Sequence, residues 1–231
     1  MNLKTIIIYI MMILFFGCSP LKKFENSKSI FESEVQKLEA LIDYKKLDNY
    51  ILFIGSSSIR RWDNMVHQMA PYQVVKRGYG GAHFYDLIHF TERLVSPHHN
   101  AKALICFVAN DISGKDKDLS SKEVFRLFKF FTRQVHRIHP ELPIYFIEIT
   151  PTPSRWKVWD QISVVNSKVQ RYATNQRLIN FISTQKIFLG PKGRPRPDLF
   201  VSDSLHLNDK AYWLWSEIIK NKLTQIQPSL N

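Results

Sequence analysis

Short apolar runs alternate along the chain with longer stretches in which apolar residues recur every three or four positions. The short runs predict strands that are buried on both faces of a sheet, and the longer stretches are typical of helices that bury one face. The apolar runs lie at residues 50–54, 73–76, 102–108 and 144–149, with a weaker one at 180–183. The helical stretches lie at 27–43, 84–95, 121–139, 161–175 and 208–225, the last with Asn208 as a capping residue.

Strands that alternate with helices of this length require right-handed crossovers, which make the sheet parallel and cover both of its faces. We therefore predict an α/β fold, a three-layer α/β/α sandwich with a flavodoxin-like parallel sheet of about five strands. The 231 residues are enough for one such domain, expected at 28–226. Ligands of open α/β sheets bind beyond the carboxyl ends of the strands, so functional residues are expected there.

The N-terminus departs from this pattern. Lys4 precedes an apolar run at residues 5–16, which Gly17 and Cys18 follow. A basic start, a short apolar run and a small residue before a cysteine are typical of a secretory signal.

Residues 14–18, Leu-Phe-Phe-Gly-Cys, resemble the lipobox of bacterial lipoproteins. The resemblance implies a signal peptide at 1–17, a lipidated Cys18 that holds the protein on a membrane, and a tether at 18–27. A plain N-terminal membrane anchor is the alternative. Either way, the domain is expected at a membrane surface of the bacterial cell envelope.

A net charge of +12 raises the question of an anionic partner. The Lys and Arg residues are scattered, with no run longer than a pair, and together with export this argues against nucleic acid. Anionic lipid headgroups explain the excess at least as well. With only two cysteines, one of them Cys106 in an apolar run, no disulfide framework is expected. The histidine pairs lack the spacing and third ligand of a zinc site, so neither a metal nor a cofactor is expected.

Polar and glycine residues follow three of the predicted strands and precede the last helix. The four segments are 55–58 (Gly-Ser-Ser-Ser), 77–81 (Arg-Gly-Tyr-Gly-Gly), 109–111 (Ala-Asn-Asp) and 203–206 (Asp-Ser-Leu-His). A serine just past a buried strand can lie at a helix start, where backbone N–H groups favour developing negative charge. An aspartate three residues before a histidine shares its face in a helical turn, so that it can orient the histidine as a general base. Together these segments predict an acyl-transfer site.

The same segments, in this order, resemble the sequence blocks of the SGNH, or GDSL-like, hydrolases, and the likeness runs from about Phe31 to Ile219. It implies that Ser57 is the nucleophile and that Asp203 and His206 are its acid and base. It further implies that the backbone N–H of Ser57, Gly81 and the Asn110 amide form the oxyanion hole. The flanking sequences are similar to a bacterial subgroup related to platelet-activating-factor acetylhydrolases.

Three positions depart from the family blocks: Ser56 replaces an aspartate, Val108 a glycine and Lys76 an asparagine. The serine run leaves Ser56 and Ser58 as alternative nucleophiles. Val108 can narrow the space beside the oxyanion asparagine.

Arg155 and Trp156 follow the fourth predicted strand. Arg155 is a candidate for binding a substrate carboxylate or sugar hydroxyl, because its planar fork suits oxygen acceptors. Trp156 is a candidate wall of the substrate site, and the alternative is that it packs a loop against the domain.

The expected function is a serine esterase that removes short acyl groups, such as acetyl, from a carbohydrate or lipid through an acyl-enzyme intermediate. The alternative is a non-catalytic surface lipoprotein that binds carbohydrate in a degenerate pocket of the same kind. Contact between Ser57 and His206 favours the enzyme, whereas a pocket filled by Val108 favours the binding protein.

Overall fold

The computed structural model describes Phe24 and residues 29–226 of the chain. The predicted signal peptide and Cys18 therefore lie outside the described residues. Within them, no helix is long and apolar enough to cross a membrane.

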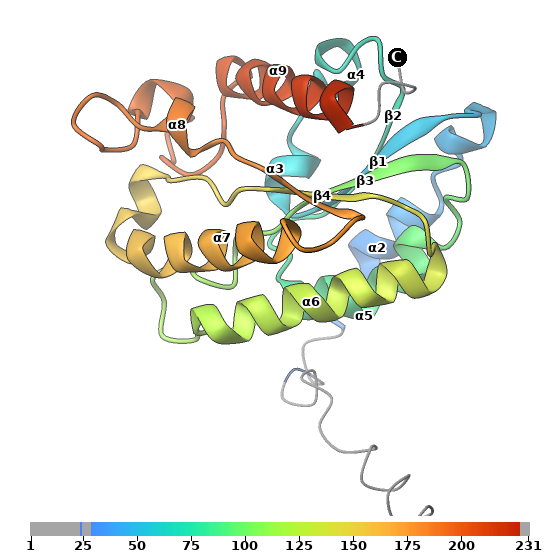
Figure 1. Cartoon of the computed structure of the whole chain (residues 1–231), viewed down its shortest axis with the longest axis horizontal. Helices are drawn as coiled ribbons and strands as arrows, with labels where there is room; N and C mark the ends of the chain where they lie inside the picture. The colour runs from blue at the N-terminus through green and yellow to red at the C-terminus, as the bar shows by residue number, and fades with distance from the viewer. Residues whose placement is uncertain (1–23, 25–28, 227–231) are drawn as a thin grey trace, which may run out of the picture.

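Five parallel strands form a single sheet in the order β2-β1-β3-β4-β5 (Figure 1). Their bounds are β1 (Tyr50–Gly55), β2 (Val74–Gly78), β3 (Ala101–Phe107), β4 (Ile144–Ile147) and β5 (Ile179–Ile182). All residues of β1 and β4 are buried, because helices cover both faces of the sheet. The α/β class, the parallel sheet and the five strands are as predicted.

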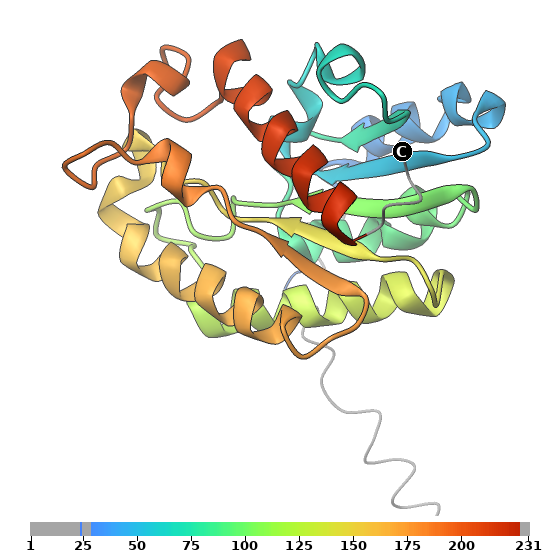
Figure 2. The ribbon, with the colours of Figure 1, turned by 45° about the horizontal axis from the view of Figure 1, so that its top comes forward.

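Helices form the two outer layers of the sandwich, as Figures 1 and 2 show. One layer holds α2 (Glu32–Glu39), α5 (Phe84–Val95), α6 (Ser121–Ile138) and α7 (Trp159–Ala173). The other holds α3 (Ser57–Arg60), α4 (Met65–Gln68) and α9 (Asp209–Ile226). A further short helix, α8 (Gln185–Phe188), follows β5, and 3₁₀ turns occupy Asp43–Lys46, Pro153–Val158 and Pro197–Leu199.

The long helices begin and end close to their predicted bounds, because their apolar spacing is regular and their caps are local. Ser120 and Glu123 form a reciprocal capping box at the start of α6. The side chain of Asn208 accepts the N–H of Ala211 at 3.1 Å at the start of α9, the capping role expected for it.

The helix predicted over 27–43 is shorter in the structure and ends at Glu39, with a 3₁₀ turn after it. A buried arginine explains the break, because Arg77 donates to the backbone oxygen of Leu41 and to the carboxylate of Asp43. Satisfying a buried guanidinium outweighs continuing the helix, and Leu41 and Ile42 are left exposed. Each of α3, α4 and α8 is a single turn, too short for apolar spacing to predict.

The strand order changes direction at the pair β1 and β3. Strand β2 lies beside β1 on one side of this pair, and β4 lies beside β3 on the other. In a doubly wound sheet this switch point opens a crevice at the carboxyl ends of the two strands. The segments that follow β1 and β3 are those that contain Ser57 and Asn110.

Candidate active site

Ser57 is the first residue of α3, directly beyond the end of β1. Gly55 ends the strand with a φ of +140°, and the Ser56 N–H then donates to the Phe107 oxygen of β3 at 2.9 Å. This sharp exit from the sheet leaves Ser57 half-buried, whereas Ser56 and Ser58 are buried. Of the three consecutive serines, the fold presents Ser57.

The hydroxyl of Ser57 meets the imidazole of His206. Ser57 Oγ lies 2.8 Å from Nε2 of His206, and Nδ1 of the same ring lies 2.6 Å from Oδ2 of Asp203. The carboxylate can only accept, so the proton of a neutral imidazole sits on Nδ1 and Nε2 accepts from the serine. This is the arrangement in which a histidine takes a proton from a nucleophilic hydroxyl.

A turn, and not the predicted helical turn, brings Asp203 and His206 together. Asp203 Oδ1 accepts the backbone N–H groups of Leu205 and His206, each at 2.9 Å. Ser204 adopts a left-handed φ of 57°, which bends the chain so that the aspartate reaches forward over its own turn. The pair is adjacent because of local hydrogen bonds to the aspartate, with no helix involved.

Asp203 is held ionised by the same contacts. Partial burial raises the pKa of the Asp203 carboxyl, but the hydrogen bonds from the His206 ring and from two backbone N–H groups lower it to about 2. Arg61 adds a weak ion pair at 3.9 Å. A carboxylate that stays charged at neutral pH can orient the imidazole and stabilise its protonated form.

Asn110 lies at the end of β3, on the same side of the sheet as Ser57, and both line one cavity. Its Nδ2 donates to the backbone oxygen of Ala82 at 2.9 Å, which leaves a second amide hydrogen for another acceptor. Two donors of Arg155 hold the other side of the residue, with 2.7 Å to Asn110 Oδ1 and 2.6 Å to the Ala109 oxygen. The amide is thus fixed in one orientation.

Arg155 lines the cavity, but two of its nitrogens are already engaged by protein oxygens. Its guanidinium holds the Asn110 side chain, a contact that the sequence did not predict. Sequence spacing gave no signal for it, because the two residues are 45 positions apart and lie in separate loops.

Gly81 has a φ of +75° and precedes Ala82, the residue whose oxygen Asn110 contacts. It is exposed and is not among the described residues that line the cavity around Ser57. The loop is held from the other side, because the Gly80 N–H donates to Glu34 Oε2 at 3.0 Å.

Trp156 is not among the described residues that line this cavity. Its ring stacks on Trp159 with the centroids 5.9 Å apart, and the Arg194 guanidinium lies 5.4 Å from its centroid on one face. These contacts agree with the alternative in which Trp156 packs a loop against the domain.

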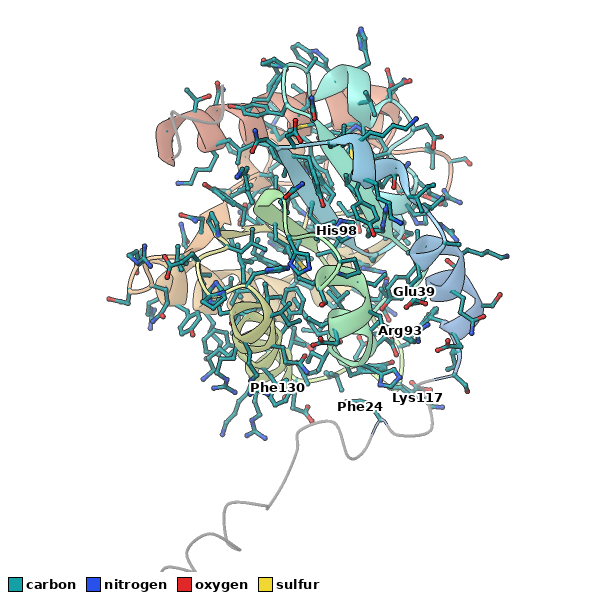
Figure 3. All side chains as sticks on the ribbon, turned by 90° about the vertical axis from the view of Figure 1, so that its right-hand side faces the viewer. Phe24, Glu39, Arg93, His98, Lys117 and Phe130 are labelled. Carbon is teal, nitrogen blue, oxygen red and sulfur yellow. The ribbon has the colours of Figure 1, made fainter. Side chains whose placement is uncertain are left out.

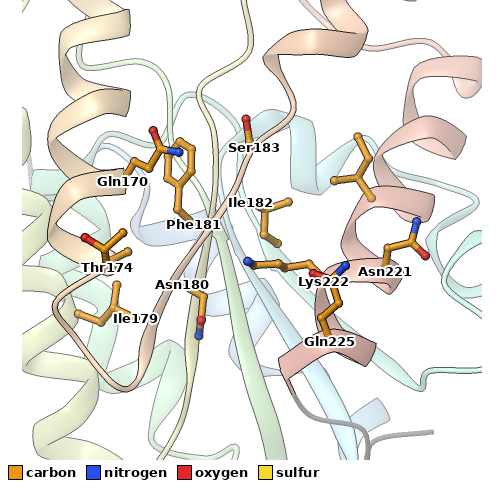
Figure 4. A pocket seen from close by; sticks show the side chains of 12 residues that line it. Gln170, Thr174, Ile179, Asn180, Phe181, Ile182, Ser183, Asn221, Lys222 and Gln225 are labelled. Atoms are coloured by element: carbon orange, nitrogen blue, oxygen red, sulfur yellow. The ribbon is translucent and has the colours of Figure 1, made fainter.

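The cavity beside Ser57 is small, with space of about 20 Å³ for water-sized groups. Several of its lining residues lie in the predicted site segments, whereas Thr150, Thr152 and Leu207 also line it without a signal in the sequence. A larger groove of about 510 Å³ lies elsewhere, between α7, β5 and α9 (Figure 4). None of the residues that line it carries the Ser-His-Asp chemistry, so its size does not make it the active site.

Comparison with solved structures agrees with this geometry. A protein of Streptococcus pneumonia, provisionally described as a platelet activating factor, superposes with a TM-score of 0.73 at 20% identity and covers 87% of this chain and 97% of its own. A GDSL-like lipase from Bacteroides thetaiotaomicron has a TM-score of 0.65 at 15% identity, with 86% and 97% covered. A carbohydrate esterase of family 3 from Talaromyces cellulolyticus has a TM-score of 0.58 at 14% identity, with 77% and 97% covered.

The chain has the fold of the SGNH, or GDSL-like, hydrolases. At these identities the likeness establishes the fold alone. No protein-family model matches the sequence, and the comparison with curated proteins found no match.

Of the three positions that depart from the family blocks, Ser56 lines the cavity, whereas Val108 and Lys76 are not among the described residues that line it. Val108 is 0% exposed in the core and is not among the described residues that line the cavity, so it does not fill the site. Lys76 donates to the backbone oxygens of Arg60 and Trp62, which ties β2 to the turn after α3. Neither departure blocks the approach to Ser57.

The described residues hold no cluster of three or more His, Cys, Asp or Glu side chains that could bind a metal ion. His98, one of the histidines outside the site, is buried and contacts the Tyr50 hydroxyl at 2.8 Å through Nδ1. Burial lowers the pKa of His98 to about 4, so it is a neutral core residue.

Proposed function

We propose that this protein is a serine ester hydrolase that removes a short acyl group, such as acetyl, through an acyl-enzyme intermediate. The observation that carries the proposal is the chain of contacts from Ser57 through His206 to Asp203, at 2.8 Å and 2.6 Å. A nucleophile, a base within hydrogen-bond reach and a group that orients the base are what acyl transfer requires.

In the first half of the reaction, Ser57 Oγ attacks the ester carbonyl while His206 Nε2 takes its proton. The carbonyl oxygen becomes an oxyanion, which the Ser57 N–H and the second amide hydrogen of Asn110 stabilise. When the tetrahedral intermediate collapses, the bond to the alcohol breaks and His206 returns the proton to the leaving oxygen. The acyl group is then bonded to Ser57.

In the second half, water attacks the acyl-enzyme while His206 accepts one of its protons. Collapse of the second intermediate releases the carboxylic acid, and the proton returns to Ser57 Oγ. Asp203 keeps the imidazole in the tautomer that accepts at Nε2 throughout.

The proposed substrate is an acylated carbohydrate or lipid. The small volume of the cavity beside Ser57 favours a short acyl group, since about 20 Å³ is little more than the space that one water needs. One structural neighbour is described as an acetyl esterase bound to acetate and another as a carbohydrate esterase, which is compatible with this choice.

We also propose that the chain is exported and held on a membrane of the bacterial cell envelope through a lipidated Cys18. The support is the sequence of residues 1–18. Labelling of the wild-type protein with a radioactive fatty acid, absent in a Cys18→Ala variant, tests this anchor.

The decisive test of the hydrolase proposal is release of p-nitrophenol from p-nitrophenyl acetate. We expect Ser57→Ala and His206→Ala each to lower kcat by a factor on the order of 10³ or more, because either loss removes the nucleophile–base unit. Ser58→Ala is the matched control, since Ser58 is buried and its neighbouring serine makes the contact with His206. Equal rates in the wild type and the two active-site variants would refute the proposal.

A further inference from the structure

Five cations lie on one face of α6. They are Lys122, Arg126, Lys129, Arg133 and Arg137, and we refer to them as the basic strip. Their spacing places them within an arc of roughly 80° on the helix and along about 22 Å of its axis. The buried face of α6 lies on the opposite side, with Val124, Phe128, Phe131 and Val135 among its residues.

The basic strip has no acidic partner within ion-pair distance among the described residues. The ion pairs of the described chain engage other cations, such as Arg93 with Glu32 and Glu39. Glu123, the single acid of α6, caps the helix start through Ser120. Four of the five strip residues are exposed, and Lys129 is half-buried. Their charges are therefore free to meet an external anion.

Two half-buried phenylalanines border the basic strip. Lys129 lies 4.9 Å from the ring centroid of Phe125, and Arg133 lies 5.8 Å from that of Phe130. Phe125 also contacts Tyr172 of α7. The helical spacing of residues 125 and 130 places the two phenylalanines on opposite flanks of the strip. A row of cations on the exposed face of a helix attracts anionic lipid headgroups.

The start of the described chain lies on the same side of the domain. Phe24 stacks on Tyr85 of α5 with the ring centroids 4.0 Å apart, and α5 packs beside α6. Figure 3 labels Phe24 and Phe130 on this side. Cys18 precedes Phe24 by six residues, which even fully extended span only about 20 Å. A membrane attachment at Cys18 would hold the basic strip close to the bilayer.

We propose that the basic strip of α6 is a docking surface for an anionic lipid bilayer. The cations meet the lipid headgroups, and the rings of Phe125 and Phe130 hold Lys129 and Arg133 on this face. A lipid surface fits this face better than nucleic acid does, because the strip is straight, lies between apolar rings and adjoins the segment that leads to the N-terminus. The inference does not depend on the hydrolase activity, since no strip residue lines the cavity of Ser57.

Docking by α6 also orients the active site. Ser121, the first residue of α6, contacts the Gln161 oxygen near the start of α7. Both helices begin at the edge of the sheet where the strands end, so α6 lies along the sheet and the site opens at its end (Figure 1). With α6 flat on the bilayer, Ser57 faces sideways along the membrane surface and not into it.

The test is flotation of the full chain with vesicles of phosphatidylcholine alone or with about a third phosphatidylglycerol. Binding through the apolar N-terminus is the same for both vesicle types. The strip therefore accounts for the increment, which is the additional binding to the vesicles that contain the anionic lipid. We expect this increment in the wild type at about 0.1 M salt and its loss at about 1 M salt. We expect Arg126→Gln/Lys129→Gln/Arg133→Gln to reduce it at least tenfold, since one cation near the surface contributes about fivefold.

Two control variants separate the strip from net charge and from folding. Lys45→Gln/Lys46→Gln/Lys186→Gln removes three exposed cations elsewhere and should bind nearly as the wild type does. Arg126→Lys/Arg133→Lys keeps the strip charged and should bind as the wild type does. Equal losses in the two triple variants, no anionic increment in the wild type, or tighter binding to a duplex oligonucleotide than to the anionic vesicles would each overturn the proposal.

Discussion

The position of one amide decides how the proposed oxyanion hole is built. Two hydrogen bonds fix the Asn110 side chain, one from Arg155 to Oδ1 and one from Nδ2 to the Ala82 oxygen, and Arg155 also holds the Ala109 oxygen beside it. Asn110 follows β3 by three residues, and an arginine from the 3₁₀ turn after β4 contacts its side chain. Preorganised donors of this kind are effective because they do not need to reorient when negative charge develops.

At the scale of the residue, we predict that Arg155 affects the rate only by holding the Asn110 amide in place. Asn110→Ala should lower kcat by about 10²–10³-fold, as expected for loss of an oxyanion donor. Arg155→Met should lower kcat about tenfold or more with little change in KM, because the amide is then free to rotate. The double variant should be no slower than Asn110→Ala alone.

The measurement is a double-mutant cycle on kcat and KM with p-nitrophenyl acetate, with thermal unfolding of each variant as the control for folding. Effects that multiply in the double variant would show that Arg155 acts independently of Asn110 and would contradict this prediction.

At the scale of the element, the join between β1 and α3 places the nucleophile. Gly55 has a φ of +140°, and a Cβ there would collide with the Phe107 carbonyl oxygen. No other residue allows β1 to stay this close to β3 and still turn sharply into the helix that begins at Ser57. The predicted strand ended at this glycine, but its conformation depends on a neighbouring strand that is distant in sequence.

We predict that Gly55→Ala is destabilising by about 2–4 kcal/mol and lowers activity at least tenfold even below the unfolding temperature. Backbone strain and displacement of Phe107 both move Ser57 away from His206. Gly193→Ala is the matched control: it also has a positive φ, of 65°, but no atom lies within 4 Å of its Cβ position. That change should cost about 1 kcal/mol and leave kcat unchanged.

Chemical denaturation and the esterase assay on both glycine variants make the comparison. Similar losses of activity in the two would contradict a special role for the turn at Gly55.

At the scale of the whole molecule, the sheet order joins segments that are far apart in sequence. Ser57 and His206 are 149 residues apart and meet because the last loop returns across the end of β1. Asp111, buried next to Asn110, ties the same edge together by accepting the Phe84 N–H at the start of α5, with 3.2 Å to each oxygen. The stability of this edge of the site therefore depends on pH through the Asp111 carboxyl.

Burial raises the pKa of Asp111 to about 6, although the His83 charge and the Phe84 N–H lower it. The folded chain therefore holds this proton at a higher pH than the unfolded chain, whose pKa is near 3.8. The stabilisation is complete below about pH 4 and is lost as pH rises through about 6. We predict that the free energy of unfolding of the wild type falls more between pH 4 and pH 7 than that of Asp111→Asn, by up to about 3 kcal/mol.

Urea unfolding of both proteins at a series of pH values gives this difference directly, because all other titrating groups are shared. Parallel pH profiles for the two would show that Asp111 does not carry the effect.

The sequence by itself determined the fold and the main reactive residues. Apolar periodicity is a local property that survives tertiary packing, so five strands, four of the long helices and their order could be read from it. The segments that contain Ser57, Asn110, Asp203 and His206 stand at the ends of predicted elements, which meet at one edge of the sheet, and the resemblance to the SGNH hydrolases implied the role of each residue. The helical spacing of the cations on α6 is also present in the sequence, but it does not stand out among the other Lys and Arg residues scattered along the chain.

Only the tertiary structure decided which serine meets His206, what Arg155 contacts and whether the cations on α6 have partners. Each of these depends on side chains from segments that are distant in sequence, and their distances follow from packing and not from spacing. The short α3, α4 and α8 and the turn at Asp203 escaped prediction for a related reason. Single turns are stabilised by contacts such as the bond from Tyr212 to the Ser58 oxygen and by side-chain to backbone bonds, and neither leaves a periodic pattern.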